Sequence, residues 1–270
     1  MQLSAPVAER VAALLGQSVT GALPLHGGDL SEVVRVRLAS GGSVVAKLGP
    51  LVEIEAEMLA AVAQTGAPAP QVRAAISGLI VMEDLAEDTG LAGAWADLGR
   101  VLRRLHGDVG RHYGWPVDYA FGPVAIENAQ MDRWPAFWAE RRLRVHLPFV
   151  PSDLARRVAA LADRLEAHLP PDPPAALLHG DLWVGNVMAR NGRVTGLIDP
   201  ACYRGDPEVD LAMLALFGQP GAEFGHTYGA LAPGWQARRQ IYQLWPALVH
   251  FRLFGDGYRG LVDRCLDGFA

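Results

Sequence analysis

Three polar residues in the second half of the chain have the types and the spacing of a phosphoryl-transfer site. Asp181 follows the segment L-L-H-G, Asn186 lies five residues later, and Asp199 lies eighteen residues after Asp181. In kinase-like sites an aspartate accepts the proton of the acceptor hydroxyl, while an asparagine and a second aspartate bind Mg²⁺ through oxygen atoms. The spacing therefore predicts that Asp181 is the catalytic base and that Asn186 and Asp199 are magnesium ligands.

A short match of this kind also arises by chance in loops, with His179 and Asp181 bonded only to backbone groups. The flanking residues favour the functional interpretation. Gly180 and Gly185 place flexible backbone around the first aspartate. Asn191-Gly192 is a strong hairpin-turn signal that leads into the strand before the second aspartate. We expect a strand, a turn and a strand that bring both aspartates to one end, with the histidine bracing the loop.

A glycine turn and a hairpin lie near the start of the chain. The turn contains Gly27, Gly28 and Ser31, and the return strand of the hairpin, residues 43–48, carries Lys47. Backbone N–H groups of such a turn can approach phosphate oxygens, and a lysine on a neighbouring strand can pair with the α- and β-phosphates. Glycine turns in hairpins are usually only turns, but together with the motif above these residues predict a site for ATP.

A helix is predicted over residues 52–64 because apolar residues recur there at helical spacing. Three glutamates lie among them, and one of these could pair with Lys47. Glu57 lies beside the apolar face of the helix, so we predict a Lys47–Glu57 pair. Glu55 stays the alternative, as does a solvated acidic face that makes no such pair.

Two further strands complete a small N-terminal lobe with an antiparallel sheet and one main helix, and the apolar periodicity turns helical beyond it. Glu83 and Leu85 flank a hinge whose backbone could meet the edge of an adenine ring. We therefore predict a bilobal α+β fold. Residues 1–84 form the expected nucleotide-binding lobe, and residues 85–270 form the expected mostly helical lobe for catalysis and acceptor binding.

Composition limits the classes of function. With 270 residues, 50% of them hydrophobic and 20% charged, the chain is suited to a globular enzyme. A net charge of −5 disfavours nucleic-acid binding, which needs a clustered basic face. Cys202 and Cys265 lack the spacing of a disulfide framework or a zinc site. No signal peptide and no apolar run long enough for a membrane span is evident, so we expect a cytoplasmic protein without membrane partners.

Two longer segments resemble a known family. L-L-H-G-D-L-W-V-G-N at residues 177–186 and I-D-P-A-C-Y-R-G-D-P-E-V-D-L-A-M at residues 198–213 are similar to the pattern of fructosamine kinases, also called ketosamine-3-kinases. That family is a branch of the protein-kinase-like superfamily, which includes aminoglycoside phosphotransferases and choline kinases. Shorter matches extend the resemblance nearly end to end, among them G-G-D at 27–29, A-E-M at 56–58 and F-G-D-G-Y-R-G at 254–260.

The resemblance implies an ATP- and Mg²⁺-dependent kinase that phosphorylates the 3-hydroxyl of a fructosamine or ribulosamine and so repairs glycated protein. By position it gives Lys47 the role of the ATP-phosphate lysine with Glu57 as its partner. The same positions make Asp181 the base, with Asn186 and Asp199 as magnesium ligands. The implied partner is a small-molecule or protein-bound ketosamine, and a monomer is expected.

The chain departs from the family pattern in one segment. Where relatives often carry Asp-Asn before the string F-I-G, this chain has Asp118-Tyr119-Ala120-Phe121-Gly122, and residues 123–130 also differ. This segment is expected to border the acceptor pocket. Pro200 replaces the phenylalanine of a protein-kinase D-F-G motif, and no long activation segment follows Asp199. Peptide substrates and activation-loop control are therefore not expected.

Aromatic residues near the motifs are candidates for acceptor binding. Trp183, two residues after the base, could stack on the apolar face of a sugar or pack under the catalytic loop. Tyr203 is a second candidate substrate contact. The sequence leaves two other functions open. The protein could be a kinase of another hydroxylated amine, such as an aminoglycoside or choline, or a catalytically silent nucleotide-binding protein.

Overall fold

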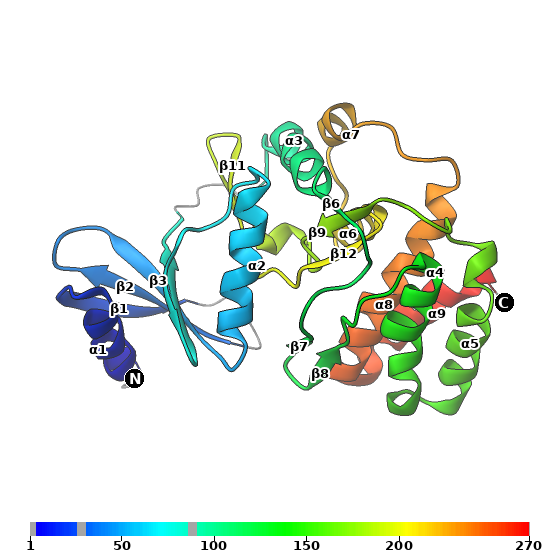
Figure 1. Ribbon diagram of the computed structural model, residues 1–270, viewed down its shortest axis with the longest axis horizontal. Helices are drawn as coiled ribbons and strands as arrows, with labels where there is room; N and C mark the ends of the chain where they lie inside the picture. Colours follow the sequence, from blue (N-terminus) through cyan, green and yellow to red (C-terminus); the bar gives the residue numbers. More distant parts are fainter. Residues whose placement is uncertain (1–3, 26–30, 86–90, 270) are drawn as a thin grey trace.

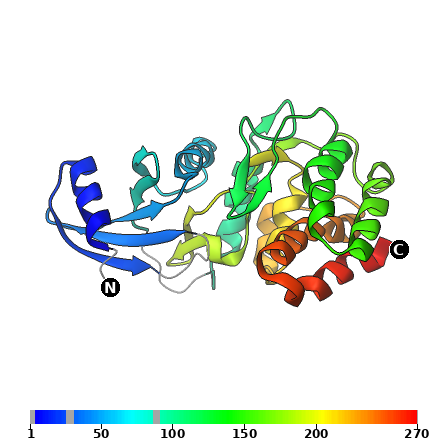
Figure 2. The same ribbon diagram turned by 90° about the horizontal axis from the view of Figure 1, so that it is seen from below.

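The computed structural model describes residues 4–25, 31–85 and 91–269. Two lobes lie side by side, a smaller N-terminal lobe built on a sheet and a larger lobe dominated by helices (Figure 1). The same separation is evident from a perpendicular direction (Figure 2). This confirms the predicted bilobal α+β fold.

The N-terminal lobe is a five-stranded antiparallel sheet with the strand order β1-β2-β3-β5-β4. One helix precedes the sheet in the chain and another follows its third strand. The elements are α1 (Ser4–Leu15), β1 (Val19–Leu25), β2 (Glu32–Leu38), β3 (Ser43–Leu48), α2 (Val52–Gln64), β4 (Val72–Ile76) and β5 (Leu79–Glu83).

The two faces of this sheet pack against different helices, and this decides where Lys47 points. Val34, Val36 and Ala46 form a buried cluster with α1, whereas Ile80 and other residues form a cluster with α2. Successive side chains of a strand alternate between the faces. Because Ala46 lies on the α1 face, its neighbour Lys47 lies on the α2 face, which is turned towards the larger lobe (Figure 1).

The larger lobe combines helices with short strands. Its helices are α3 (Trp95–His106), α4 (Trp134–Phe137), α5 (Ser152–Ala162), α6 (Glu208–Leu214), α7 (Ala222–Tyr228), α8 (Trp235–Phe254) and α9 (Arg259–Leu266). Its strands are β6 (Val109–Gly110), β7 (Tyr119–Phe121), β8 (Val124–Ile126), β9 (Ala175–Leu178), β10 (Val187–Arg190), β11 (Arg193–Leu197) and β12 (Tyr203–Gly205). They form the sheet β12-β9-β6 and two hairpins, β7-β8 and β10-β11.

A buried arginine organises the core beneath the site. Arg142 lies in the π-helical turn Trp138–Leu143 that continues α4, and its guanidinium lies 4.1 Å from the ring centre of Tyr203 and 4.9 Å from that of Trp245. Arg142 Nη2 donates to Asn128 Oδ1 at 2.7 Å. Charge–ring contacts are stronger away from water. The arginine therefore fixes residue 128, just after the β7-β8 hairpin, onto the core.

None of the helices in the part of the chain that the structure describes has the length and apolar character needed to cross a bilayer.

Candidate active site

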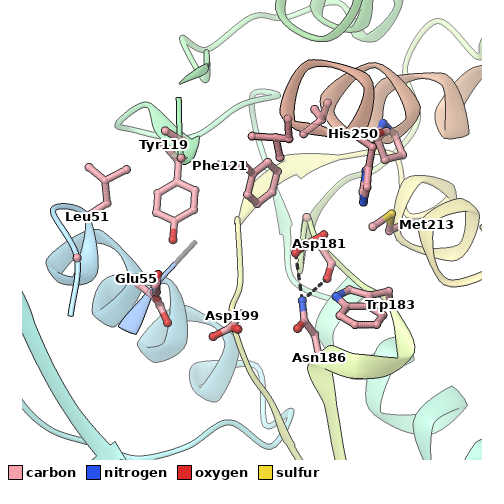
Figure 3. A pocket seen from close by; sticks show the side chains of 18 of the residues that line it. Leu51, Glu55, Tyr119, Phe121, Asp181, Trp183, Asn186, Asp199, Met213 and His250 are labelled. Carbon is pink, nitrogen blue, oxygen red and sulfur yellow. Dashed lines mark hydrogen bonds between the residues drawn. The ribbon is translucent and has the colours of Figure 1, made fainter. Parts of the chain in front are cut away.

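A pocket of about 1070 Å³ lies between the lobes, and half of the candidate site residues from the sequence line it. Ser31, Lys47 and Glu55 line it on the side of the smaller lobe. Asp181, Asn186 and Asp199 lie in its middle, and α8 lines the far end together with other parts of the larger lobe (Figure 3). The pocket therefore joins the predicted nucleotide residues to the predicted catalytic residues.

The catalytic loop leaves the buried strand β9 through a backbone bend that requires glycine. Gly180 has a φ of 82°, and a Cβ added there would overlap the carbonyl oxygen of Ala201. Asp210, in α6, accepts hydrogen bonds from the backbone N–H groups of His179 at 2.7 Å and Gly180 at 3.0 Å. The buried carboxylate thus fixes the loop from the neighbouring helix.

His179 braces the loop from the other side, as the sequence predicted. Its ring is fully buried, and Nε2 donates to the carbonyl oxygen of Ile198 at 2.9 Å. Burial lowers the pKa of His179 despite the nearby charge of Asp210, so the ring stays neutral near pH 7. The histidine therefore ties the loop that carries Asp181 to the segment that carries Asp199.

Asp181 and Asn186 are directly bonded. The Asn186 amide nitrogen donates to the Asp181 carbonyl oxygen at 2.8 Å and to its carboxylate Oδ2 at 3.1 Å. The Asn186 oxygen is on the side that faces Asp199 (Figure 3). Burial, and then the negative charge of Asp199, raises the pKa of Asp181 to about 7. Two carboxylates and one amide oxygen thus converge on one part of the pocket.

Asp199 is held in an unusual backbone conformation. It follows the β10-β11 hairpin, whose turn at Asn191 (φ 52°) and Gly192 (φ 71°) confirms the predicted hairpin. Asp199 itself has a φ of 53°, in the left-handed region that non-glycine residues rarely adopt. Such strain persists only where the surroundings impose it, and it clusters at functional sites. The carboxylate accepts a hydrogen bond from Lys47 Nζ at 2.9 Å.

Lys47 pairs with Glu55, so the predicted Lys47–Glu57 pair is wrong. Lys47 Nζ lies 2.7 Å from Glu55 Oε2, whereas Glu57 is exposed on the opposite side of α2. Glu55 follows Val52 by three residues and precedes Leu59 by four, which places all three on the sheet-facing side of the helix. The error came from centring the buried face on Ile54, which is only partly buried.

Both members of this pair are buried and charged. Burial by itself would lower the pKa of Lys47, but the carboxylates of Glu55 and Asp199 raise it above its ordinary value. Burial raises the pKa of Glu55, and the ammonium of Lys47 opposes that change. Removing one member would leave the other buried without its countercharge, which is costly in proteins. The pair therefore holds the ammonium at a defined place beside Asp199.

The other residues predicted to bind the nucleotide do not all line the pocket. Ser31 lines the pocket, but Gly27 and Gly28 lie outside the described residues. The Gln71 backbone N–H donates to Glu83 Oε2 at 3.2 Å, and Leu85 packs against Gly196. Neither Glu83 nor Leu85 is among the residues that line the pocket, and a backbone contact from them to adenine stays a prediction.

The two predicted substrate residues have different surroundings. Trp183 is partly exposed and lines the pocket, with its indole lying across Gly185, where a Cβ would overlap the ring. Tyr203 is fully buried, stacks on Phe137 at 5.9 Å and does not line the pocket. The prediction that Tyr203 contacts substrate is therefore wrong, because β12 turns its side chain into the core.

Sequence reasoning missed the aromatic and apolar surface at the far end of the pocket. The residues concerned are Met213, Phe217, Trp245, Val249, His250, Leu253, Phe254 and Tyr258. They adjoin Phe121 of the segment 118–122, which the sequence analysis expected at the acceptor pocket and which lines this pocket from Tyr119 to Gly122. Phe217 and Phe254 are 44% and 46% exposed although both are large and apolar. The α8 members recur at three- and four-residue spacing, which would have signalled a helix face, but such a stripe usually indicates core packing. The distinguishing feature is exposure, which the sequence does not contain.

Comparisons with known proteins agree over nearly the whole chain. The family model for fructosamine kinase matches residues 6–269. A probable ketoamine kinase of Thermus thermophilus is 36% identical over 262 residues, covering 91% of this chain and 92% of the relative. A chloroplastic protein-ribulosamine 3-kinase of Arabidopsis thaliana is 29% identical over 209 residues, covering 71% of this chain and 62% of the relative.

Solved structures give the same result for the fold. The crystal structure of a protein described as a putative fructosamine-3-kinase, from Thermobifida fusca, superposes with a TM-score of 0.89 at 32% identity, with 97% of each chain covered. An aminoglycoside phosphotransferase, solved with AMP-PNP and hygromycin B, has a TM-score of 0.71 at 19% identity, covering 98% of this chain and 99% of that one. The latter supports only a shared fold. With the site geometry, these matches establish that the chain belongs to the fructosamine kinase family.

Proposed function

We propose that the protein transfers the γ-phosphoryl group of ATP to the 3-hydroxyl of ketosamines, the fructosamine and ribulosamine adducts of sugars with amines. The observation that carries the proposal is the charged chain Glu55–Lys47–Asp199, which lies in one pocket with the bonded pair Asp181 and Asn186. Membership of the fructosamine kinase family supports the choice of acceptor. The named relatives are ketoamine and ribulosamine kinases.

Lys47 and Ser31 are the proposed nucleotide contacts on the smaller lobe. The ammonium of Lys47 is anchored on two carboxylates, so it presents a fixed positive charge to an incoming phosphate chain. An anchored donor needs little reorganisation when the transition state develops charge. The glycine turn at Gly27 and Gly28 and the hinge at Glu83 and Leu85 are proposed to complete the ATP site.

The residues present fit a magnesium ion. Asp199 and the Asn186 amide oxygen are hard oxygen ligands on one side of the pocket. The raised pKa of Asp181, caused first by burial and then by Asp199, indicates negative charge that a cation would offset. We propose that Asn186 and Asp199 hold Mg²⁺, which supplies charge neutralisation on the phosphate oxygens.

Asp181 is the proposed base. Its carboxylate accepts a hydrogen bond from Asn186, and this contact fixes the direction in which the free oxygen faces the pocket. A carboxylate placed in this way is suited to accept a proton as the hydroxyl oxygen bonds to phosphorus. Trp183, beside it, is proposed to lie against the apolar face of the sugar.

Phosphorylation at this position has a chemical consequence. The 3-hydroxyl of a ketosamine is a poor leaving group, but its phosphate ester is a good one and lies next to an enolisable ketone. Loss of a proton and of inorganic phosphate then gives an unsaturated adduct that releases the amine on hydrolysis. The proposed physiological result is repair of glycated amines and proteins.

The pocket favours a ketosamine over a polyamine acceptor. Among the residues that the structure describes, the acidic ones in the lining are Glu55, Asp181 and Asp199, all at the proposed phosphate and cation end. The far end of the pocket, which is the proposed acceptor end, is aromatic and apolar instead. An aminoglycoside with several ammonium groups needs carboxylates around it. A catalytically silent protein is disfavoured because the proposed base, magnesium ligands and lysine are all present. A monomeric state and a cytoplasmic location stay predictions.

An acceptor panel tests the proposal. ADP release is followed with Mg²⁺–ATP and, in turn, fructosyl-lysine, ribulosyl-lysine, kanamycin and choline. We expect turnover that depends on either ketosamine and none above background with the other two. Turnover with kanamycin or choline and none with a ketosamine would replace the proposed acceptor class.

A further inference from the structure

The β7-β8 hairpin belongs to the larger lobe, yet it reaches the Lys47–Glu55 pair of the smaller lobe. Tyr119, Phe121 and Gly122 of this hairpin line the pocket. The Tyr119 hydroxyl points towards Glu55 across the pocket (Figure 3). Tyr119 is also the residue at which the chain departs from the Asp-Asn pattern of the family it resembles.

The two carboxylate oxygens of Glu55 have different surroundings. Oε2 pairs with Lys47 at 2.7 Å, but Oε1 is buried and accepts no hydrogen bond within the described ranges. A buried carboxylate oxygen without a donor is unfavourable, so a hydroxyl that reaches it has a large effect. Tyr119 is the neighbouring donor that points towards Glu55 (Figure 3). Burial, and then the charge of Glu55, raises the pKa of Tyr119, so its hydroxyl keeps the proton that it could donate.

The hairpin is a rigid support for this hydroxyl. Asp118 Oδ1 accepts a hydrogen bond from the Asn128 backbone N–H at 2.7 Å, which closes the base of the hairpin. Arg142 holds the Asn128 side chain from the core at 2.7 Å. The position of Tyr119 is therefore set by the larger lobe and not by α2, which carries Glu55.

A series of aromatic contacts connects the same hairpin to the acceptor end. The Tyr119 ring makes an edge contact with Phe121, with ring centres 6.4 Å apart. Phe121 in turn contacts Trp245 of α8, with ring centres 6.3 Å apart. An acceptor that packs against Phe121 therefore touches the element that carries the Tyr119 hydroxyl.

We propose that Tyr119 is a positioning residue that donates a hydrogen bond to Glu55 Oε1 and thereby fixes Lys47 for the nucleotide. Because the hydrogen bond joins the two lobes, it favours the arrangement in which Lys47 and Asp199 are together. This inference rests on the nucleotide part of the proposed function and does not depend on the identity of the acceptor.

Tyr119→Phe tests the inference, because it removes the hydroxyl and keeps the ring contact with Phe121. Binding of Mg²⁺–AMP-PNP is measured by calorimetry. We expect an affinity about 10- to 150-fold below that of the unchanged protein, the range for a hydrogen bond to a charged group. In steady-state assays the KM for ATP should rise by a similar factor with a smaller change in kcat, whereas partial misfolding would lower only the apparent kcat.

A matched control and a double substitution complete the design. Tyr113→Phe removes a hydroxyl that donates to the carbonyl oxygen of Pro173 at 2.7 Å, away from the pocket, and should leave nucleotide affinity unchanged. In a Glu55→Gln background, Tyr119→Phe should weaken binding by less than twofold, since the two residues act as one unit. An equal loss in both backgrounds, or no loss in either, would overturn the inference. Failure of the unchanged protein to bind Mg²⁺–AMP-PNP would instead contradict the proposed function.

Discussion

At the scale of single residues, the site depends on like charges that the fold keeps close together. Asp181 and Asp199 share one pocket, and among the described residues the ammonium of Lys47, at Asp199, is the one cation paired with them. Burial and Asp199 raise the pKa of Asp181 to about 7, a departure that is typical of functional carboxyl groups. The arrangement is unfavourable in the free protein and suited to a cation and a phosphate chain.

The first prediction concerns Asp181. Asp181→Asn keeps the size of the side chain but cannot accept the hydroxyl proton, so kcat should fall by a factor of at least about 10². Affinity for Mg²⁺–AMP-PNP, measured by calorimetry, should change by less than about threefold, because the lysine and Asp199 are untouched. A variant with more than a tenth of normal turnover would show that another group takes the proton.

The residue types of the site could be predicted from the sequence, because a loop of fixed length carries them. A 3-10 turn connects Asp181 to Asn186, and the tight hairpin β10-β11 connects Asn186 to Asp199, which leaves few possible arrangements. Tyr203 could not be placed in the same way. Whether a strand residue faces a pocket or the core depends on which face the rest of the lobe covers, and that is decided by distant residues such as Arg142.

At the scale of elements, the catalytic loop and α6 hold each other through Asp210. This fully buried carboxylate accepts two backbone N–H bonds from the loop and lies 3.2 Å from His106 Nε2 of α3. One side chain therefore connects a helix, a loop and a second helix. His106 and Asp210 are 104 residues apart in the chain, so no local pattern in the sequence indicates their contact.

The second prediction concerns this connection. Asp210→Asn replaces one carboxylate oxygen by an NH₂ group, which cannot accept a hydrogen bond from the backbone N–H groups of the loop. We therefore expect a loss of about 2–4 kcal/mol in the free energy of unfolding. kcat should fall because the loop that carries Asp181 loses its support. Urea unfolding and steady-state assays measure both quantities. Asp163→Asn, an equal change at an exposed position, serves as the control and should alter neither.

The helix α2 illustrates a limit of periodicity arguments. Helical spacing predicted the element and showed that one glutamate could reach Lys47, but it could not define the centre of the buried face to within two residues. Val52, Met58 and Leu59 are buried and Ile54 is only partly so, which turns the face by enough to select Glu55 over Glu57. A rotation of this size is fixed by packing against the sheet.

At the scale of the whole molecule, the larger lobe contains a buried histidine that sensitises it to acid. His146, in the 3-10 helix Arg144–Phe149, is 1% exposed, and its Nδ1 lies 3.3 Å from Arg252 Nη1. Burial, and then the positive charges of Arg252 and Arg142, lowers the pKa of His146 to about 3. The folded state therefore holds this ring neutral.

The third prediction follows from that shift. Because the folded pKa lies below the unfolded value, the contribution of His146 is fully present above pH 6.5 and is lost as the pH falls towards 3, by about 1.4 kcal/mol per pH unit. His146→Gln should flatten the decrease in unfolding free energy between pH 6.5 and 4.5, measured by urea titration. The exposed His226→Gln should not. Parallel pH profiles for His146→Gln and the unchanged protein would contradict the assignment.

The overall fold was predictable because the order of turn, hairpin, helix and catalytic loop is encoded locally, and the lobes follow from that order. At the far end of the pocket, the proposed acceptor end, only the segment that contains Phe121 was expected from the sequence. Phe217 and the exposed side of α8 were not, since they come from segments far apart in the chain. The proximity of Tyr119 and Glu55 could not be predicted from the sequence for the same reason. Contacts between lobes have no local signal in a single sequence.

The most direct test of the central claim is where the phosphate is placed and what happens next. Fructosyl-lysine labelled with ¹³C in the sugar is incubated with Mg²⁺–ATP and the protein, and phosphorus and carbon NMR spectra are recorded over time. We predict a phosphate ester coupled to the sugar C3, followed by equal amounts of free lysine and inorganic phosphate, with neither product from the Asp181→Asn variant. A phosphate on any other sugar carbon, or ADP formation without a sugar phosphate, would contradict the account.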